Sequence, residues 1–198
     1  MNFPDLLRAL RNGDIAEVNS DDAMAVYHLV VGYGTANAAT QPLLKAFESC
    51  FEGPGAAEGF TRAYLGGVPM DAVFDTLLAL VGTHSEDVLR PIATAFTERG
   101  FPTIIVDAIS QRRPALFLFE PTVLCLSSVW RGFILGATAV DAVLGERQRL
   151  EEAAYDAWIR QYYGYPHAHW SRLLRILEGP SESGLEAFAR HWAEFSKQ

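Results

Sequence analysis

The chain has 198 residues, 49% of them hydrophobic and 20% charged, with a net charge of −8 at pH 7. These values predict a folded domain with a sizeable core and exclude a chain that is disordered over most of its length. They also disfavour a nucleic-acid partner, because phosphate binding needs clustered Lys and Arg. Residues 1–100 carry 13 acids and 6 bases, against 11 and 10 in the remainder. This acidic half either favours a basic partner or is ordinary solubilising charge.

Apolar residues at helical spacing predict helices along nearly the whole chain. The first spans 3–10, and Ser20 is expected to cap a second that ends near Gly32 and Gly34. Thr40 is expected to cap a third. Further helices are predicted over 56–65, 69–82, 83–100 and 101–113. In the last of these, the β-branched run 103–106 also permits a strand, but a lone strand would lack a partner, so helix is favoured.

The segment Pro121–Leu144 is almost free of charge and predicts a helix that is buried on nearly all sides. Its length also fits a membrane span, but Arg131 at the midpoint and the lack of flanking Lys/Arg clusters argue against one. No secretory signal is recognised at the N-terminus, so a cytoplasmic location is expected. A stripe of small residues on this helix predicts close approach of another helix, from the same chain or from a second copy. The stripe consists of Cys125, Ser128, Gly132, Gly136 and Ala139.

Three more helices are expected after this segment, over 146–163, 170–177 and 183–195. Ser183 and Glu186 have the spacing of a capping box at the start of the last one. The sequence therefore predicts an all-α fold: a single domain over 1–198, with about nine to eleven helices packed around a buried central helix at 121–144.

Two charged residues, Arg131 and Asp141, lie in the segment expected to be most buried. Ten residues of helix place them about 15 Å apart, so they cannot pair with each other. Asp75, Glu120 and Asp156 are candidate partners for Arg131. The interpretations are a core ion pair that fixes helix register, an anchor for an anionic ligand, or a polar floor in a helical pocket.

No pattern in the sequence identifies a phosphate loop, a serine nucleophile elbow, a metal site or a cofactor site. His28 is predicted to be a hydrogen-bonded core histidine, and His167 and His169 to be surface or helix-capping residues. Cys50 and Cys125 both fall in apolar helical patterns, which predicts two buried free thiols.

The segment 155–170 is the densest aromatic stretch of the chain. Large, stiff side chains with polar tips suit a binding surface, and they equally suit the junction between packed helices. The candidate ligand- or partner-binding residues are Trp130, Arg131, Phe133, Tyr155, Trp158, Tyr162, Tyr163, Tyr165, His167 and His169.

The order Trp130-Arg131-Gly132-Phe133, Ala154-Tyr155 and Gln161-Tyr162-Tyr163-Gly164-Tyr165 resembles the second half of glycolipid transfer proteins. Those are all-helical lipid carriers, so the resemblance implies an all-helical fold with an apolar-ligand pocket. It covers about forty residues and departs from the family pattern at its key positions. Tyr163 stands where the family has its headgroup-binding His, Tyr165 replaces a Trp, and the Asp-x-x-x-Asn-x-x-Lys motif is absent.

Three functions remain open. The first is a non-catalytic protein that binds another protein, such as a neutralising (immunity-type) protein, an adaptor or a chaperone. The second is a carrier or sensor of an apolar small molecule, lodged near Trp130, Arg131 and Phe133. The third is an enzyme with an unfamiliar helical site that uses His28 or His167 with a nearby carboxylate.

Overall fold

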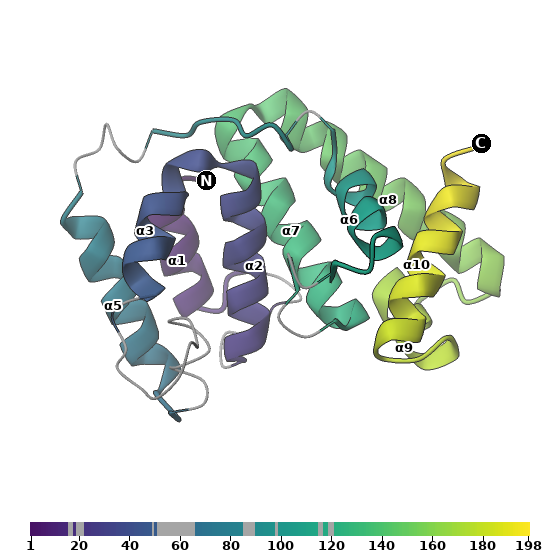
Figure 1. The fold of residues 1–198 in the computed structure, drawn as a ribbon, viewed down its shortest axis with the longest axis horizontal. Helices are drawn as coiled ribbons and strands as arrows, with labels where there is room; N and C mark the ends of the chain where they lie inside the picture. Colours follow the sequence, from purple (N-terminus) through teal and green to yellow (C-terminus); the bar gives the residue numbers. More distant parts are fainter. Residues whose placement is uncertain are drawn as a thin grey trace.

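The computed structural model of the chain describes residues 1–15, 18, 22–48, 50, 66–84, 90–97, 99–114, 117–118 and 121–198. Within these ranges the fold is all-α, as expected, and contains no strand (Figure 1). The expectation of one domain over 1–198 stays a prediction. The elements are α1 (Phe3–Arg11), α2 (Ala23–Ala36), the 3-10 helix η1 (Ala38–Thr40), α3 (Gln41–Glu48), α5 (Met70–Gly82), α6 (Phe101–Ser110), α7 (Val123–Val140), α8 (Ala142–Tyr163), α9 (Trp170–Leu177) and α10 (Glu182–Phe195).

Helices α2 and α7 lie side by side and run parallel in the middle of the molecule (Figure 1). A Cβ atom added to Gly132 would overlap the carbonyl oxygen of Leu29, and one added to Gly32 would overlap that of Val129. A Cβ on Gly136 would lie 2.5 Å from the carbonyl oxygen of Tyr33. The small-residue groove of α7 therefore receives α2 of the same chain, at a separation that only glycine permits.

The α2–α7 pair separates two apolar cores. One core gathers buried side chains from α1, α2, α3 and α5. Its largest members are Phe3, Tyr33, Phe47 and Phe74. The other gathers side chains from α6 to α10. Its largest members are Phe101, Trp130, Phe133, Tyr155, Trp170, Phe188 and Trp192.

The helix predicted over 121–144 ends earlier, at Val140. Asp141 leaves the helical conformation, and its carboxylate accepts hydrogen bonds from the amides of Val143 (2.7 Å) and Leu144 (3.4 Å). It thereby caps a new helix, α8, which begins at Ala142 rather than 146. The expectation that Asp141 is buried was wrong, because its side chain works as an exposed N-cap.

Two other helix starts were also predicted wrongly. Asp22, not Ser20, caps α2, and Ser20 lies outside the described residues. Helix α2 then continues through Gly32 and Gly34 to Ala36. Gly32 serves the contact with α7, and Gly34 lies against Thr40 and Leu44, so neither ends the helix. Helix α10 begins at Glu182, so Ser183 is inside it and does not cap it.

The helix predicted over 83–100 is absent from its described part, 90–97. This segment instead covers the C-terminal end of α2. The side chain of Asn37 accepts a hydrogen bond from the Ile92 amide (3.0 Å), and the hydroxyls of Thr94 and Thr97 donate to the carbonyls of Thr35 (2.6 Å) and Ala36 (3.0 Å). These contacts satisfy carbonyls that a helix end leaves unpaired.

Three further expectations concern residues 103–106, the two cysteines and the segment 56–65. Residues 103–106 are helical, within α6. Cys50 is exposed, so the prediction that it is buried was wrong, whereas Cys125 is buried and neither thiol forms a disulfide. The helix predicted at 56–65 lies outside the described residues.

Among the described residues, α7 alone has the length and hydropathy of a membrane span, with a mean hydropathy of 1.6 over 18 residues. In the folded chain 56% of that window is buried, as in the core helix of a bundle.

The glycine contact gives a direct test. Gly132→Ala should lower the free energy of unfolding by about 3 kcal/mol, because α2 and α7 must separate to admit the methyl group. Gly82→Ala is the matched control: among the described residues no atom lies within 4 Å of its added Cβ, so this variant should be neutral or more stable by up to about 1 kcal/mol. Urea unfolding followed by far-UV circular dichroism measures both, and equal losses would contradict the close packing.

Candidate functional site

Two of the predicted binding residues, Trp130 of α7 and Tyr155 of α8, lie at the centre of an aromatic core. Their ring centroids are 6.1 Å apart, and both rings contact those of Trp170, Phe188 and Trp192. Trp130 and Tyr155 are completely buried, so in this conformation neither can meet a partner's surface.

The aromatic core leaves polar atoms without partners. Among the described residues, nothing forms a hydrogen bond with Trp130 Nε1 or with the Tyr155 hydroxyl. Burial raises the pKa of Tyr155 well above its ordinary value, so this hydroxyl stays protonated. A buried hydroxyl without a partner costs stability, so Tyr155 stabilises the core through the area its ring buries rather than through its oxygen.

Phe133 and Arg131 occupy different surroundings. Phe133 is buried against Phe101, with ring centroids 5.6 Å apart. Arg131 is half-buried, and its Nε has no hydrogen-bond partner in the described part of the chain. Two of its predicted partners are engaged elsewhere, Asp75 with Arg11 and Asp156 with Arg160, while the third, Glu120, lies outside the described residues.

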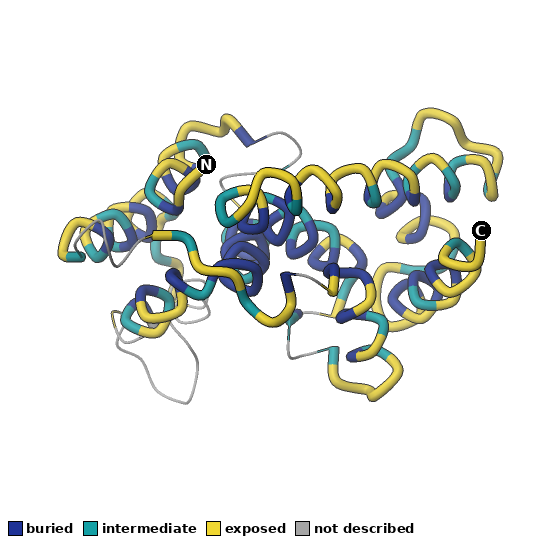
Figure 2. Tube along the Cα trace, turned by 90° about the horizontal axis from the view of Figure 1, so that it is seen from above, coloured by how far each residue is buried: buried dark blue, intermediate teal, exposed yellow. Residues whose placement is uncertain are grey.

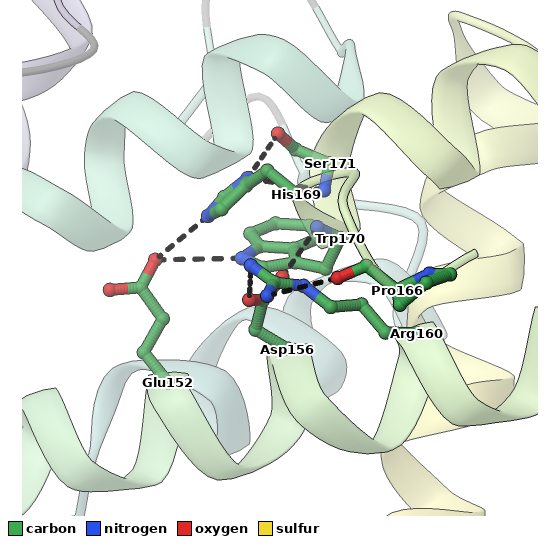
Figure 3. A network of polar contacts seen from close by, with 7 residues as sticks. All are labelled: Glu152, Asp156, Arg160, Pro166, His169, Trp170 and Ser171. Atoms are coloured by element: carbon green, nitrogen blue, oxygen red, sulfur yellow. Dashed lines mark hydrogen bonds and ion pairs between the residues drawn. The ribbon is translucent and has the colours of Figure 1, made fainter.

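A polar network joins α8 to the start of α9 (Figure 3). Asp156 accepts a hydrogen bond from the backbone amide of Trp170 (2.7 Å) and pairs with Arg160. Glu152, nearly buried, accepts from the Trp170 indole at 3.5 Å and lies 4.0 Å from His169 Nε2. The other ring nitrogen of His169 lies 2.8 Å from the Ser171 hydroxyl.

This network places a serine, a histidine and a carboxylate in the order that nucleophilic enzymes use. Here, however, His169 is the N-cap of α9, and its Nδ1 also accepts a hydrogen bond from the Ser171 amide at 3.4 Å. Ser171 is buried, and it is not among the residues that line the cavity at the start of α2 and α7. The arrangement clamps α9 onto α8, and the prediction that His169 caps a helix is confirmed.

A second polar cluster holds Tyr163 of α8 against α10. The Tyr163 hydroxyl donates to Glu178 at 2.5 Å, and Glu178 also pairs with Arg190 at 3.3 Å. His191 is buried beneath Tyr162 and Tyr163, with Nε2 3.4 Å from the Tyr163 oxygen. Burial lowers the pKa of His191, and the hydrogen bond from Tyr163 lowers that of Glu178.

The other predicted site residues are more accessible. Tyr162, Tyr165 and His167 are exposed, and Trp158 is half-buried. His28, in contrast, is a buried core residue whose Nδ1 lies 2.6 Å from the carbonyl oxygen of Met24, as predicted.

The solvent side of α8 is a feature that sequence reasoning missed. Val143 and Leu150 are 77% and 54% exposed, and three exposed alanines extend the same apolar strip. We define the outer face of α8 as Val143, Leu150, Ala153, Ala154 and Ala157. In Figure 2 one side of this long helix is exposed along its whole length.

A cavity of about 280 Å³ opens where α2 and α7 begin. It lies away from Trp130, Arg131 and Phe133, around which the sequence placed a ligand pocket. Its lining comes from α2, α7, α9 and the segments beside them: Asp22, Met24, Ala25, Thr122, Leu124, Cys125, Ser128, Arg175 and Pro180.

Comparison of the chain with protein-family models, curated proteins and solved structures finds no match. The function is therefore argued from the geometry of these sites.

The aromatic core predicts a distinctive response to removal of a hydroxyl. Tyr155→Phe should leave stability unchanged or raise it by about 1 kcal/mol, because the hydroxyl has no partner. Tyr163→Phe, the matched control, should lower it by about 1 kcal/mol, because it removes the hydrogen bond to Glu178. Chemical denaturation measures both. A marked loss for Tyr155→Phe would show that its hydroxyl is bound in the folded protein.

The buried histidines predict a pH dependence. Burial lowers the folded-state pKa of His28 and of His191 below the ordinary 6.5. Below pH 6.5 the unfolded chain therefore binds more protons than the folded one, and stability should fall as the pH drops from 6.5 to 5. His191→Gln should flatten this dependence, whereas His167→Gln, at an exposed position, should not. Unfolding free energies measured across this pH range provide the check.

Proposed function

We propose that this protein acts without catalysis by binding another protein, and that it binds through the outer face of α8. The observation that supports this is an exposed apolar strip on the solvent side of α8, formed by Val143, Leu150 and three alanines. Gln148 and Glu152 lie on its buried side, whereas Val143 and Leu150 point to solvent. An exposed apolar strip of this kind is typical of interaction surfaces.

The buried side of α8 is fully used by its own chain. It consists of Gly145, Gln148, Glu152, Tyr155 and Ile159. Gln148 accepts a hydrogen bond from the amide of Phe101 at 3.3 Å, and Glu152 accepts the indole hydrogen of Trp170. Because these polar groups have partners inside the bundle, turning α8 to bury Leu150 instead would break them.

The spacing on the solvent side suggests a helical partner. Residues 143, 147, 150, 154, 157 and 161 alternate in steps of four and three, the spacing of a coiled-coil seam. Four of the six are apolar, and the other two are Arg147 and Gln161. All six lie opposite the buried side when placed on a helix. The 22 residues of α8 give a contact line of about 33 Å, and its alanines allow a helix to approach closely.

Charge on this face is balanced within α8 itself. Arg149 pairs with Glu146 one turn away, and Arg147 acts on the carboxylate of Glu151. The seam therefore offers little net charge, which supports a partner helix with an apolar face rather than a strongly basic one. Tyr162 and Tyr165, both exposed, lie at its C-terminal end and are suited to anchor a partner.

The test of this proposal places two negative charges on the outer face of α8. Leu150→Glu combined with Ala154→Glu should abolish retention of a stoichiometric partner in affinity purification from native lysate, read out by mass spectrometry. Ile176→Glu is the matched control, because Ile176 is 70% exposed on α9 and should leave retention unchanged. Circular dichroism verifies that both variants fold.

A photo-crosslinking residue at position 150 should then attach to a helical segment of the same partner. Equal retention of the partner by both variants would contradict the proposal. It would also be contradicted if the partner were a second copy of this chain, in a dimer that only the double variant disrupts. The cytoplasmic location and the lack of a nucleic-acid partner remain predictions.

A further inference from the structure

The cavity at the start of α2 and α7 has two kinds of lining. Met24, Leu124 and Cys125 supply an apolar wall, and Thr122 and Arg175 supply polar groups. Leu124 is 43% exposed, so the apolar wall continues outward. A pocket with an apolar wall and a few polar groups suits an amphipathic small molecule.

Helix α9 indicates the charge of the polar group that such a small molecule would carry. Arg172, Arg175 and Ile176 share the solvent side of that short helix, at positions i, i+3 and i+4. None of the ion pairs between described residues involves Arg172 or Arg175. Arg175 brings a positive charge to the cavity wall, and Arg172 lies about one turn away on the same side of α9.

Among the described residues, the acid in the cavity lining is Asp22, and its own helix holds it. Asp22 accepts hydrogen bonds from the amides of Met24 (2.9 Å) and Ala25 (3.2 Å), so its carboxylate faces the positive end of α2. Thr122 likewise accepts from the amide of Cys125 at 3.2 Å, which leaves its hydroxyl hydrogen able to donate to a ligand.

We propose that this cavity binds a small carboxylate with an aliphatic chain, its carboxylate paired with Arg175 and its chain against Met24 and Leu124. At ~30 Å³ per water-sized group, the volume of about 280 Å³ holds roughly nine such groups. That size fits an aliphatic acid of about six to eight carbons. This site is separate from the outer face of α8 and does not depend on it.

Octanoate is the probe, with binding followed by titration calorimetry. We expect saturable 1:1 binding that Arg175→Gln weakens by about tenfold, since a charge-assisted hydrogen bond is lost. Arg113→Gln is the matched control, because it removes an exposed arginine outside the cavity lining and should change nothing. Ala25→Leu, which fills the cavity, should abolish binding while circular dichroism shows the fold intact.

The charge of the ligand distinguishes a site for a carboxylate from a site for an ammonium group. Octylamine should bind more weakly than octanoate, and Asp22→Asn should strengthen octanoate binding by removing a like charge. Octylamine binding as tightly as octanoate would overturn the proposal, as would equal effects of Arg175→Gln and Arg113→Gln. Adsorption to phosphatidylglycerol vesicles without saturable octanoate binding would also overturn it. The double variant Leu150→Glu/Ala154→Glu should bind octanoate normally, so the two proposals fail independently.

Discussion

The contact between α2 and α7 is the constraint on which the rest of the structure depends. The hydrogen that stands in place of a side chain on Gly132 points at the carbonyl of Leu29, and the one on Gly32 points at that of Val129. Such reciprocal Cα–H···O contacts form only when two helices meet backbone to backbone. The two apolar cores lie on either side of the α2–α7 contact, so any change in the spacing of these helices is transmitted to both cores.

Parallel packing has an electrostatic consequence. The positive ends of both helix dipoles lie at the same end of the molecule, where they repel each other. Asp22 and Thr122, the N-caps of α2 and α7, satisfy amides at that end, and the carbonyl of Pro180 accepts the Val123 amide at 3.3 Å. The cavity opens at this same end, where its lining joins the starts of α2 and α7 with Arg175 of α9 and with Pro180. The parallel pair that requires glycine in its middle therefore has a partly polar site at its N-terminal end.

Much of the fold is readable from the sequence because helix periodicity and the small-residue stripe are local signals. The stripe predicts that a backbone approaches Gly132 and Gly136, but periodicity carries no information about which helix arrives. Gly32 and Gly34 were interpreted as a helix end for the same reason: a glycine that permits close packing and one that ends a helix look alike without the neighbour. Asp141 likewise lies in an unbroken apolar pattern, and only its hydrogen bonds to Val143 and Leu144 reveal a cap.

The candidate sites were harder to predict, because helix α8 carries two stripes with the same spacing. Gln148, Glu152 and Tyr155 repeat at four and three, and so do Leu150, Ala154 and Ala157. By hydrophobicity alone the second set belongs inside. The structure buries the first set, because Tyr155 packs within the aromatic core. On the same side Gln148 accepts a hydrogen bond from the Phe101 amide and Glu152 accepts one from the Trp170 indole. Aromatic packing and these hydrogen bonds together favour this rotation of α8, which leaves the apolar stripe in solvent.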